Sequence, residues 1–411
     1  MYNNDMNGEI KRTKYLEKIL EWKDTHFIKV LTGIRRCGKS TIINQYQEHL
    51  KNIGVDEKQI IYYDFNDYRL VKKYDWEKLV NEIESKSDST KTNYVFLDEI
   101  QEINNFEKCI ITLFENKKYK YDIYITGSNS HMFSEELATL FTGRTKKIKI
   151  FPFTFKEVKE NVLTSMSEYD ALFEYLKYGG LGVIVPFYKE YRKAVMVLHE
   201  TLEDILTKDI FLRYKIKTRN DFEKIIDFTF SQLSNRISAT KLGNYLKSKN
   251  EVVVSKSTIL RFLKWMCNSM ILDNVLFYNT KGKEKLITRM KYYAGDLGIA
   301  NIYKSFDVNI DTGYRLENLV YLELIANEYE VFTFLDNSEN EVDFVAIKDN
   351  KTTYIQVCKD LNEDNYQRES KTLLKIKDNH EKIILFLNNS VSFKNDGIKQ
   401  VSLTKWLLTE K

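Results

Sequence analysis

Short apolar runs alternate with segments of helical spacing in the first part of the chain. Residues 27–31 form a run rich in strand formers, and a helical pattern begins at Thr41. Further runs of strand type occupy residues 94–97, 123–126 and 147–151. Strands that alternate with helices along a sequence favour an α/β fold built on a parallel sheet.

The pattern changes after residue 155. Residues 155–217 have mostly helical spacing, with an interruption at Gly179-Gly180. Three helical segments and two strand segments follow, at residues 222–233, 239–246, 255–265, 271–278 and 285–293. Ser238 is a good N-cap for the second of these helices. The C-terminal part begins with a helix around Glu317 and continues with strand segments at residues 341–347 and 353–358.

Length and composition exclude several classes of protein. The 411 residues suggest about two to four domains. No run of about eighteen apolar residues exists, and the start is polar, so neither a membrane span nor a signal peptide is expected. The four cysteines lie far apart without CxxC spacing, which argues against a disulfide framework or a zinc site. We therefore expect a cytoplasmic protein.

A phosphate-binding motif follows the first strand. Residues 33–40 match GxxxxGK[ST] and stand between a strand and a helix, as this motif requires. The two glycines allow backbone N–H groups to point at phosphate, and the helix N-terminus adds partial positive charge. Lys39 would neutralise the β- and γ-phosphates, and Ser40 would bind Mg²⁺. We expect ATP to contact Gly33, Arg35, Arg36, Cys37, Gly38, Lys39, Ser40 and Thr41.

Two acids follow the strand at residues 94–97. The carboxyl end of a neighbouring parallel strand is where an acid that binds magnesium is expected. We predict that Asp98 holds Mg²⁺ together with Ser40, and that Glu99 acts as general base toward the attacking water. An isolated Asp-Glu pair is usually a solvated pair, but the apolar strand before it favours the catalytic role.

Two further residues are candidates for contact with the γ-phosphate. Asn129, preferred to Ser128, follows the strand at residues 123–126, although these residues also suit a simple turn. Arg144 precedes the strand at residues 147–151 and would be an arginine finger, in cis or from a neighbouring subunit. Arg35 and Arg36 are alternatives for this contact, and a surface charge is the alternative role for Arg144.

The sequence resembles uncharacterised archaeal and bacterial AAA-type ATPases of the DUF4143 type. The resemblance rests on residues 31–40, 96–101, 125–130, 141–144 and 151–155, and it extends to residues 178–181, 291–293, 296–298, 316–318 and 341–345. It implies an α/β, AAA-type P-loop domain, a helical lid, a winged helix and a C-terminal α/β domain similar to restriction endonucleases. The implied boundaries are residues 1–155, 156–217, 218–304 and 305–411.

Positive charge is concentrated in the region expected to be a winged helix. Residues 216–298 carry 15 Lys and Arg against 7 Asp and Glu, whereas the whole chain has a net charge of +4. Phosphate binding favours such a distribution. The expected contacts with DNA are Lys256, Arg261 and Lys264 of the recognition-type helix, and Lys281 and Lys283 of the wing. A structural or protein-contact module is the alternative.

The last domain resembles PD-(D/E)XK nucleases but departs from their pattern. Glu317 and Asp343 match acids of that pattern, whereas Gln356 stands where an acid is expected and Cys358 where a lysine is expected. An amide is a poor ligand for Mg²⁺, and a cysteine cannot supply the fixed charge of a lysine. We therefore predict a nuclease-like fold that does not cut DNA.

These features predict an ATP-hydrolysing conformational switch that acts on or with DNA. The expected ligands are ATP and Mg²⁺, and a protein partner or self-association is a further possibility. The alternative is a nucleotide-gated signalling or scaffold protein whose tail binds a protein. An active metal-dependent nuclease is disfavoured by Gln356 and Cys358.

Overall fold

The structure, a computed structural model, describes residues 10–128, 141–248, 254–278, 285–336, 338–389 and 396–409. Contacts divide the chain into two units, with the boundary between Phe151 and Pro152. Asn129, Lys281 and Lys283 lie outside the described residues. No helix in the described part of the chain is both long and apolar enough to cross a membrane.

The first unit is built on one five-stranded sheet. Its strands are β1 Ile28–Thr32, β2 Ile60–Asp64, β3 Thr92–Asp98, β4 Lys120–Gly127 and β5 Thr145–Lys149. Its helices are α1 Thr13–Glu21, α2 Lys39–Asn52, α3 Tyr68–Lys73, α4 Trp76–Lys86 and α5 Phe106–Phe114, with single turns η1 Glu57–Gln59 and η2 Ile100–Glu102. The predicted strands in this region are confirmed.

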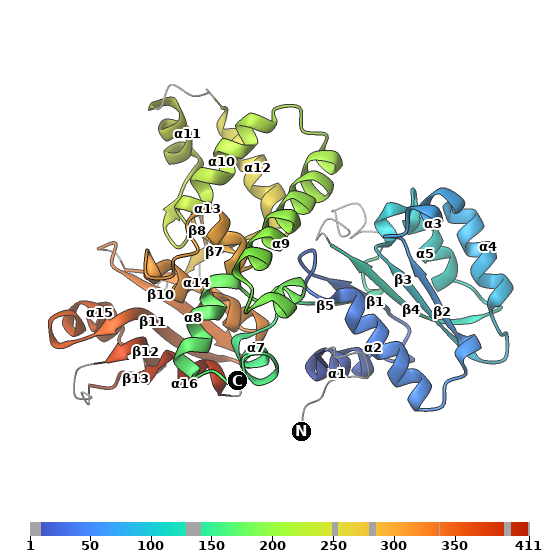
Figure 1. Ribbon diagram of the computed structural model, residues 1–411, viewed down its shortest axis with the longest axis horizontal. Helices are drawn as coiled ribbons and strands as arrows, with labels where there is room; N and C mark the ends of the chain where they lie inside the picture. The colour runs from blue at the N-terminus through green and yellow to red at the C-terminus, as the bar shows by residue number, and fades with distance from the viewer. Residues whose placement is uncertain are drawn as a thin grey trace. The chain divides into compact units, whose positions relative to one another are not determined.

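All five strands are parallel, in the order β2-β3-β4-β1-β5. Side chains alternate between the two faces, so Ile28 and Val30 pack with residues of α4 and α5. Tyr46 of α2 contacts the rings of Phe96 and Tyr124 on the opposite face. Helices therefore cover both faces of the sheet (Figure 1). The P-loop strand β1 and the acidic strand β3 are separated by β4, whereas the sequence suggested direct neighbours.

The second unit contains a larger, mixed sheet and most of the helices. The helices are α7 Phe155–Asn161, α8 Glu168–Tyr178, η4 Gly182–Phe187, α9 Tyr191–Asp204, the π-helix η5 Ile205–Leu212, α10 Arg219–Ser231, α11 Ala239–Ser248, α12 Lys256–Asn268, α13 Leu297–Tyr303, α14 Thr312–Ala326, α15 Glu363–Lys375 and α16 Leu403–Leu408. The strands are β6 Arg236–Ile237, β7 Leu272–Tyr278, β8 Lys285–Ala294, β9 Glu330–Leu335, β10 Glu341–Lys348, β11 Lys351–Leu361, β12 Glu381–Asn389 and β13 Lys399–Ser402.

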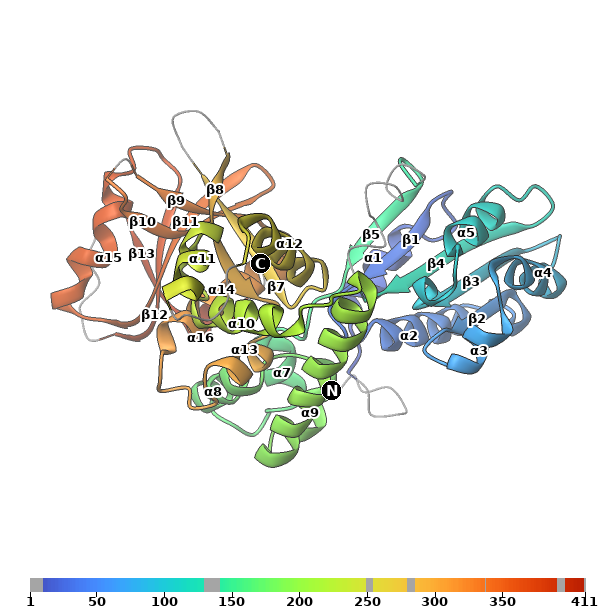
Figure 2. The same ribbon diagram turned by 90° about the horizontal axis from the view of Figure 1, so that it is seen from above.

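One eight-stranded sheet joins the regions expected to be separate domains. Its order is β13-β12-β11-β10-β9-β7-β8-β6, so the hairpin β7–β8 continues the C-terminal strands (Figure 2). The link is a short parallel pairing of β7 with β9, at Phe277 with Thr333 and Tyr278 with Phe334. The antiparallel set β9-β10-β11 then continues into parallel strands β12 and β13.

The helices expected to form a lid pack within this second unit. Gly179 adopts φ +72°, and a Cβ there would lie 2.3 Å from Asp296 Oδ1. Asp296 accepts hydrogen bonds from the backbone N–H groups of Gly180, at 2.8 Å, and Ile299, at 3.2 Å. The interruption at Gly179-Gly180 is therefore a buried junction between α8 and α13.

Candidate nucleotide-binding and hydrolysis site

The loop after β1 has the backbone of a phosphate cradle. Gly38 adopts φ +99° at the start of α2, and Arg36 adopts φ +68°. A Cβ at Gly33 would lie 2.4 Å from the carbonyl oxygen of Ile150 and 2.6 Å from Cys37 Sγ, so only glycine fits there. Cys37 is buried, Arg35 is half-buried and Arg36 is exposed. The cysteine thus supports the loop, while both arginines are accessible to solvent.

Lys39 lies in the first turn of α2, and only 5% of its surface is exposed. Its Nζ donates to the carbonyl oxygen of Gly33 at 3.1 Å and lies 3.4 Å from Glu99 Oε1. The ammonium therefore faces both the loop and the acid after β3. Ser40 and Thr41 follow at the start of the same helix and are half-buried.

The acids after β3 are held by β4. Asp98 is fully buried, and its Oδ1 accepts a short hydrogen bond from the Thr126 hydroxyl. Thr126 Oγ1 also accepts from the backbone N–H of Glu99 at 2.9 Å. The Tyr62 hydroxyl donates to Asp98 Oδ2 at 3.4 Å. Thr126 and Tyr62 were not predicted as site residues, although each lies at or near the carboxyl end of a strand.

Glu99 has an unusual backbone. It adopts φ +51°, a left-handed conformation that is uncommon outside glycine and often found at functional sites. Its side chain accepts hydrogen bonds from Gln101 Nε2 and, at 3.3 Å, from the backbone N–H of Ser128. The carboxylate is thus aimed at the edge of the sheet where the P-loop also ends.

The two acids have opposite pKa shifts. Burial raises the pKa of Asp98, although hydrogen bonds from Ser40 and Thr126 lower it. Burial also raises the pKa of Glu99, but the charge of Lys39, the Gln101 hydrogen bond and the charge of Arg35 together lower it below the ordinary value. Glu99 is therefore ionised at neutral pH, as a general base must be.

The donor set fits a nucleotide with magnesium. The Ser40 hydroxyl lies within hydrogen-bonding reach of Asp98. Two oxygen ligands of the kind that Mg²⁺ prefers therefore lie next to each other. Gly33 and Gly38 add no side chain to the loop, and Lys39 supplies positive charge beside it. Lys39, the P-loop backbone, Ser40 and Asp98 could therefore hold the phosphates and the ion.

Comparison with known proteins agrees with this chemistry. The family model of an AAA domain, AAA_14, matches residues 25–159. A protein of Haemophilus influenzae, described as "Uncharacterized protein", is 33% identical over 405 residues, which is 97% of this chain and 98% of the relative. The chain belongs to this family of AAA-domain proteins.

Other members and a solved structure extend the comparison. A protein of Methanocaldococcus jannaschii, described as "Uncharacterized protein MJ1544", is 32% identical over 97% of this chain and 92% of its own. A domain of unknown function, DUF8612, matches residues 169–309, whereas the sequence alone suggested the DUF4143 type. The Walker-type ATPase paby2304 of Pyrococcus abyssi has the same fold, with a TM-score of 0.51 and 14% identity over 74% of this chain and 98% of that one.

Arg144 lies at the wrong edge of the sheet for a contact in cis. Its carbonyl oxygen accepts from the backbone N–H of Ile28, at the amino end of β1, whereas the P-loop follows the carboxyl end. Its guanidinium pairs with Glu115 at 2.9 Å, and its side chain is 40% exposed. Arg144 therefore cannot reach a phosphate held by the P-loop of its own chain, because the length of β1 separates them.

A second buried lysine lies in the other unit of this AAA-domain protein. Lys291 of β8 is 3% exposed, and its Nζ pairs with Glu317 at 2.8 Å, with Glu341 at short distance and with Asp343 at 3.9 Å. The Tyr293 hydroxyl also donates to Glu317, at 2.7 Å. Burial lowers the pKa of Lys291, but the three carboxylates raise it by more, so that the pKa lies above its ordinary value and the residue is charged. The sequence did not predict any role for Lys291.

Asp343, Gln356 and Cys358 adjoin this cluster. Asp343 Oδ2 accepts from the backbone N–H of Val357 at 2.8 Å, and Gln356 donates to Glu369 at 3.2 Å. Burial and the Glu317 charge raise the pKa of Asp343, and burial raises the pKa of Cys358 to about 12. Among the residues that the structure describes, no group of three or more His, Cys, Asp or Glu has the geometry of a metal site.

The helix α12 presents its predicted DNA contacts to solvent. Ser255 caps it by accepting from the Thr258 N–H at 3.1 Å. Ile259, Phe262, Leu263 and Met266 are buried on its inner face. Lys256, Arg261 and Lys264 are exposed on the outer face. The three cations are therefore free of the core and available to a partner.

Proposed function

We propose that this protein is an Mg²⁺-dependent ATPase whose nucleotide cycle drives a conformational switch that acts on DNA. The observation that carries the ATPase part is the convergence of Lys39, Asp98 and Glu99 at one edge of the sheet of the first unit. An AAA domain matches this unit, which supports nucleotide binding. DNA as the partner rests on charge and topology in the second unit.

The binding step is assigned to the P-loop. The backbone N–H groups between Gly33 and Gly38 would surround the phosphates, and the start of α2 would add its partial charge. The Lys39 ammonium would turn from Glu99 to the β- and γ-phosphate oxygens. Ser40 and Asp98 would hold Mg²⁺, which when bound neutralises charge on the phosphates.

The hydrolytic step is assigned to Glu99. Its carboxylate, released from Lys39, would orient a water molecule and accept its proton as the water attacks the γ-phosphorus and the bond to the β–γ bridging oxygen breaks, releasing ADP. Thr126 is a positioning residue, because it binds both the carboxylate of Asp98 and the backbone N–H of Glu99. A shift of Thr126 would therefore misplace the metal ligand and the base together.

DNA binding is assigned to the part of the second unit that resembles a winged helix. Three helices, α10, α11 and α12, precede the hairpin β7–β8, which is the order of a winged helix. The outer face of α12 carries Lys256, Arg261 and Lys264 within a region of strong positive charge. Phosphate contacts by such residues give affinity that falls with salt.

We further propose that the C-terminal strands form a nuclease-like core without cleavage activity. The order α14, β9, β10, β11, α15, β12 supports this resemblance. The ammonium of Lys291 lies among Glu317, Glu341 and Asp343, where a nuclease would need a metal ion. Metal-dependent cleavage of linear or circular DNA that is abolished by Asp343→Ala would contradict this reading.

The test couples hydrolysis to DNA. Steady-state ATP hydrolysis is measured with and without duplex DNA, for the wild type and for Lys256→Ala/Arg261→Ala/Lys264→Ala. We expect DNA to stimulate ATP hydrolysis by the wild type. In a plot of the logarithm of DNA affinity against the logarithm of salt concentration, the triple variant should lose up to about three units of slope. A matched control, Lys72→Ala/Lys78→Ala/Lys118→Ala, removes three exposed cations of the first unit.

The outcomes separate two functions. DNA-stimulated turnover that depends on the α12 cations supports the DNA-coupled switch. Turnover that requires Lys39 but ignores DNA would indicate a nucleotide-gated signalling or scaffold protein, and the partner would then be sought among proteins. Equal salt slopes in the triple variant and its control would contradict α12 as the DNA surface.

A further inference from the structure

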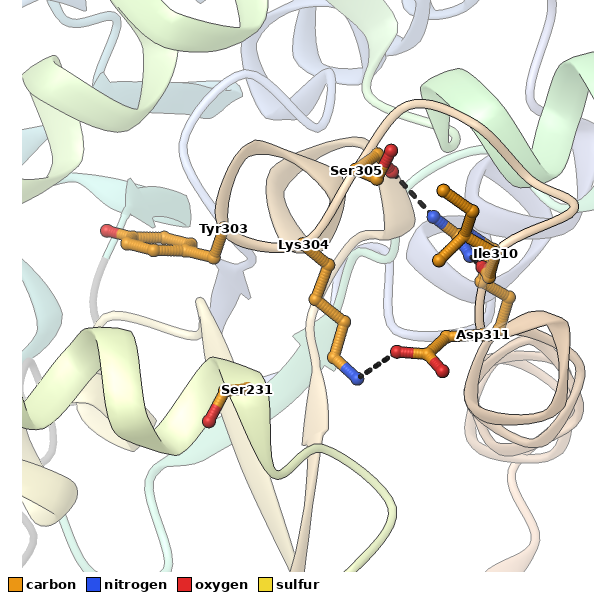
Figure 3. Close-up of a pocket in the computed structure, with 7 residues that line it drawn as sticks. Ser231, Tyr303, Lys304, Ser305, Ile310 and Asp311 are labelled. Carbon is orange, nitrogen blue, oxygen red and sulfur yellow. Dashed lines mark hydrogen bonds and ion pairs between the residues drawn. The ribbon is translucent and has the colours of Figure 1, made fainter.

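A pocket of about 200 Å³ lies in the second unit, between the end of α10 and the segment that joins α13 to α14. It is lined by Ser231, Tyr303, Lys304, Ser305, Ile310, Asp311 and Arg315. Figure 3 shows the Lys304 ammonium between Ser231 and Asp311, with the ring of Tyr303 directed away. None of these residues belongs to the nucleotide site or to the carboxylate cluster around Lys291.

Lys304 is mostly buried, but its positive charge is only weakly compensated by its neighbours. Its side chain is 11% exposed, and its Nζ lies 3.8 Å from Asp311 Oδ2, too far for a hydrogen bond. The ammonium also lies 3.8 Å from the centre of the Tyr314 ring. Within the described parts of the chain, Nζ donates no hydrogen bond. Burial lowers the pKa of Lys304, which shows that the surroundings do not repay the cost of its charge.

Arg315 adds a second buried cation. It is fully buried, and its guanidinium donates to Asn301 Oδ1 at 3.1 Å and to the carbonyl oxygens of Ser305 and Ile310. These are neutral acceptors. No carboxylate of the described residues lies within ion-pair distance of the guanidinium, so its charge is hydrogen-bonded but not neutralised.

The balance of charge around the pocket is positive. Asp311, with a side chain 69% exposed, is the acid that lines it, and solvent screens this carboxylate more than the two cations. The helix α14, of 15 residues, begins at Thr312 and directs its N-terminus to this region. The Ser305 oxygen accepts from the Asp307 N–H at 3.0 Å, which leaves its hydroxyl hydrogen for a ligand.

We propose that this pocket binds a small oxyanion of the phosphate class, with the Lys304 ammonium as its main contact. A neutral ligand would leave two buried cations uncompensated, whereas a phosphate group can accept from Lys304 and be stabilised by the field of Arg315. The volume suits a phosphate or a small phosphorylated molecule, not a nucleotide. Asp311 competes with the ligand for Lys304.

The site predicts an unusual relation between affinity and stability. Lys304→Met keeps the volume and removes a buried charge that makes no hydrogen bond, so it should weaken anion binding without lowering the melting temperature. A lysine with a purely structural role predicts the opposite, a lower melting temperature. Asp311→Asn removes the competing carboxylate and should strengthen binding.

The probe is inorganic phosphate, titrated into the full chain by calorimetry. Lys39→Ala is present in every sample, so that the P-loop does not contribute. We expect a single site that Lys304→Met weakens by about tenfold or more, Lys304→Arg retains, and Asp311→Asn tightens several-fold. A small phosphomonoester in a parallel titration distinguishes the free ion from a phosphorylated molecule as the preferred ligand.

Two results would overturn the proposal. One is phosphate affinity that is unchanged by Lys304→Met. The other is the lack of phosphate binding up to about 10 mM in the Lys39→Ala background, because a buried cationic pocket should exceed that affinity. Because every sample lacks Lys39, neither result bears on the ATPase proposal.

Discussion

Two buried lysines, one in each unit, pair with acids but lie in different surroundings. Lys39 is 5% exposed and lies 3.4 Å from Glu99. Lys291 is 3% exposed and has three carboxylates within 3.9 Å. Burial and pairing with acids are thus common to both, and neither property distinguishes a ligand site from a structural ion pair.

The neighbours make the difference. Lys39 stands beside a glycine loop and a helix N-terminus, so the backbone adds positive potential that an anion can satisfy. The acids around Lys291 already neutralise it, and Arg236 pairs with one of them, Glu341, at 2.9 Å. Under the proposed function the first lysine would exchange Glu99 for the phosphates of a nucleotide, whereas the second completes its ion pairs within the fold.

The largest effect is expected at the P-loop. Lys39→Ala should reduce ATP hydrolysis by about two to three orders of magnitude and weaken ATP binding, because the charge beside the β- and γ-phosphates is lost. Lys51→Ala, on the same helix and paired at the surface with Glu48, is the control and should behave as the wild type. If Lys39→Ala hydrolysed ATP as fast as the control, the contrast drawn between Lys39 and Lys291 would be wrong.

The second effect is on stability. Lys291→Met should lower the free energy of unfolding by about 3–5 kcal/mol, because it leaves buried carboxylates without their cation. Lys39→Met should cost only about 1–2 kcal/mol, since Gln101 and Ser128 still donate to Glu99. Urea denaturation of both variants measures the two costs. Equal losses would show that Lys39 is as structural as Lys291.

The third effect depends on pH and concerns the buried junction at Asp296. Burial raises the pKa of Asp296 to about 6, although backbone N–H groups, including that of Gly180, lower it. The folded state therefore binds this proton more tightly than the unfolded state, and stability from this group is present below pH about 4 and lost as pH rises through about 6. The shift corresponds to about 3 kcal/mol.

The check uses Asp296→Asn, which cannot titrate. Between pH 4 and 7 the unfolding free energy of the wild type should fall relative to that of Asp296→Asn, by up to about 3 kcal/mol. Other titrating groups cancel in this difference. Parallel curves for the two proteins would mean that Asp296 has the same pKa in the folded and unfolded states.

The smallest effect sharpens the description of the first site. Thr126→Val should slow hydrolysis by about tenfold and raise the Mg²⁺ concentration needed for half-maximal rate, because it frees Asp98 and Glu99 from a shared hydrogen-bond partner. Thr126→Ser retains the hydroxyl and should restore both. A lower rate with an unchanged requirement for Mg²⁺ would point to packing rather than positioning.

Much of the first unit could be predicted from sequence, because its chemistry is local. The P-loop and the acids at 98 and 99 are contiguous motifs, and the structure brings them together. Thr126 and Tyr62 were missed because they reach Asp98 through the strand order, which places β3 between β2 and β4. For Arg144, the pairing of β5 with β1 leaves a contact from a neighbouring subunit or a surface charge as the remaining alternatives.

The second unit was less predictable because its contacts are remote in sequence. The segments 271–278 and 285–293 were predicted as strands, but not their pairing with β9 in one sheet. Lys291 meets Glu317 and Asp343 only in the folded chain. Nothing in the sequence indicated that the Lys291 ammonium lies among Glu317, Glu341 and Asp343.

The most direct test of the central claim compares the acids of the two units. Steady-state ATP hydrolysis with Mg²⁺ is measured for the wild type, Glu99→Gln and Asp343→Asn, with ATP binding measured in parallel. We predict that Glu99→Gln binds ATP but hydrolyses it at least about 100-fold more slowly than the wild type. The hydrolysis rate of Asp343→Asn should match that of the wild type. Hydrolysis that survives Glu99→Gln, or that is lost only in Asp343→Asn, would contradict the assignment of catalysis to the P-loop unit.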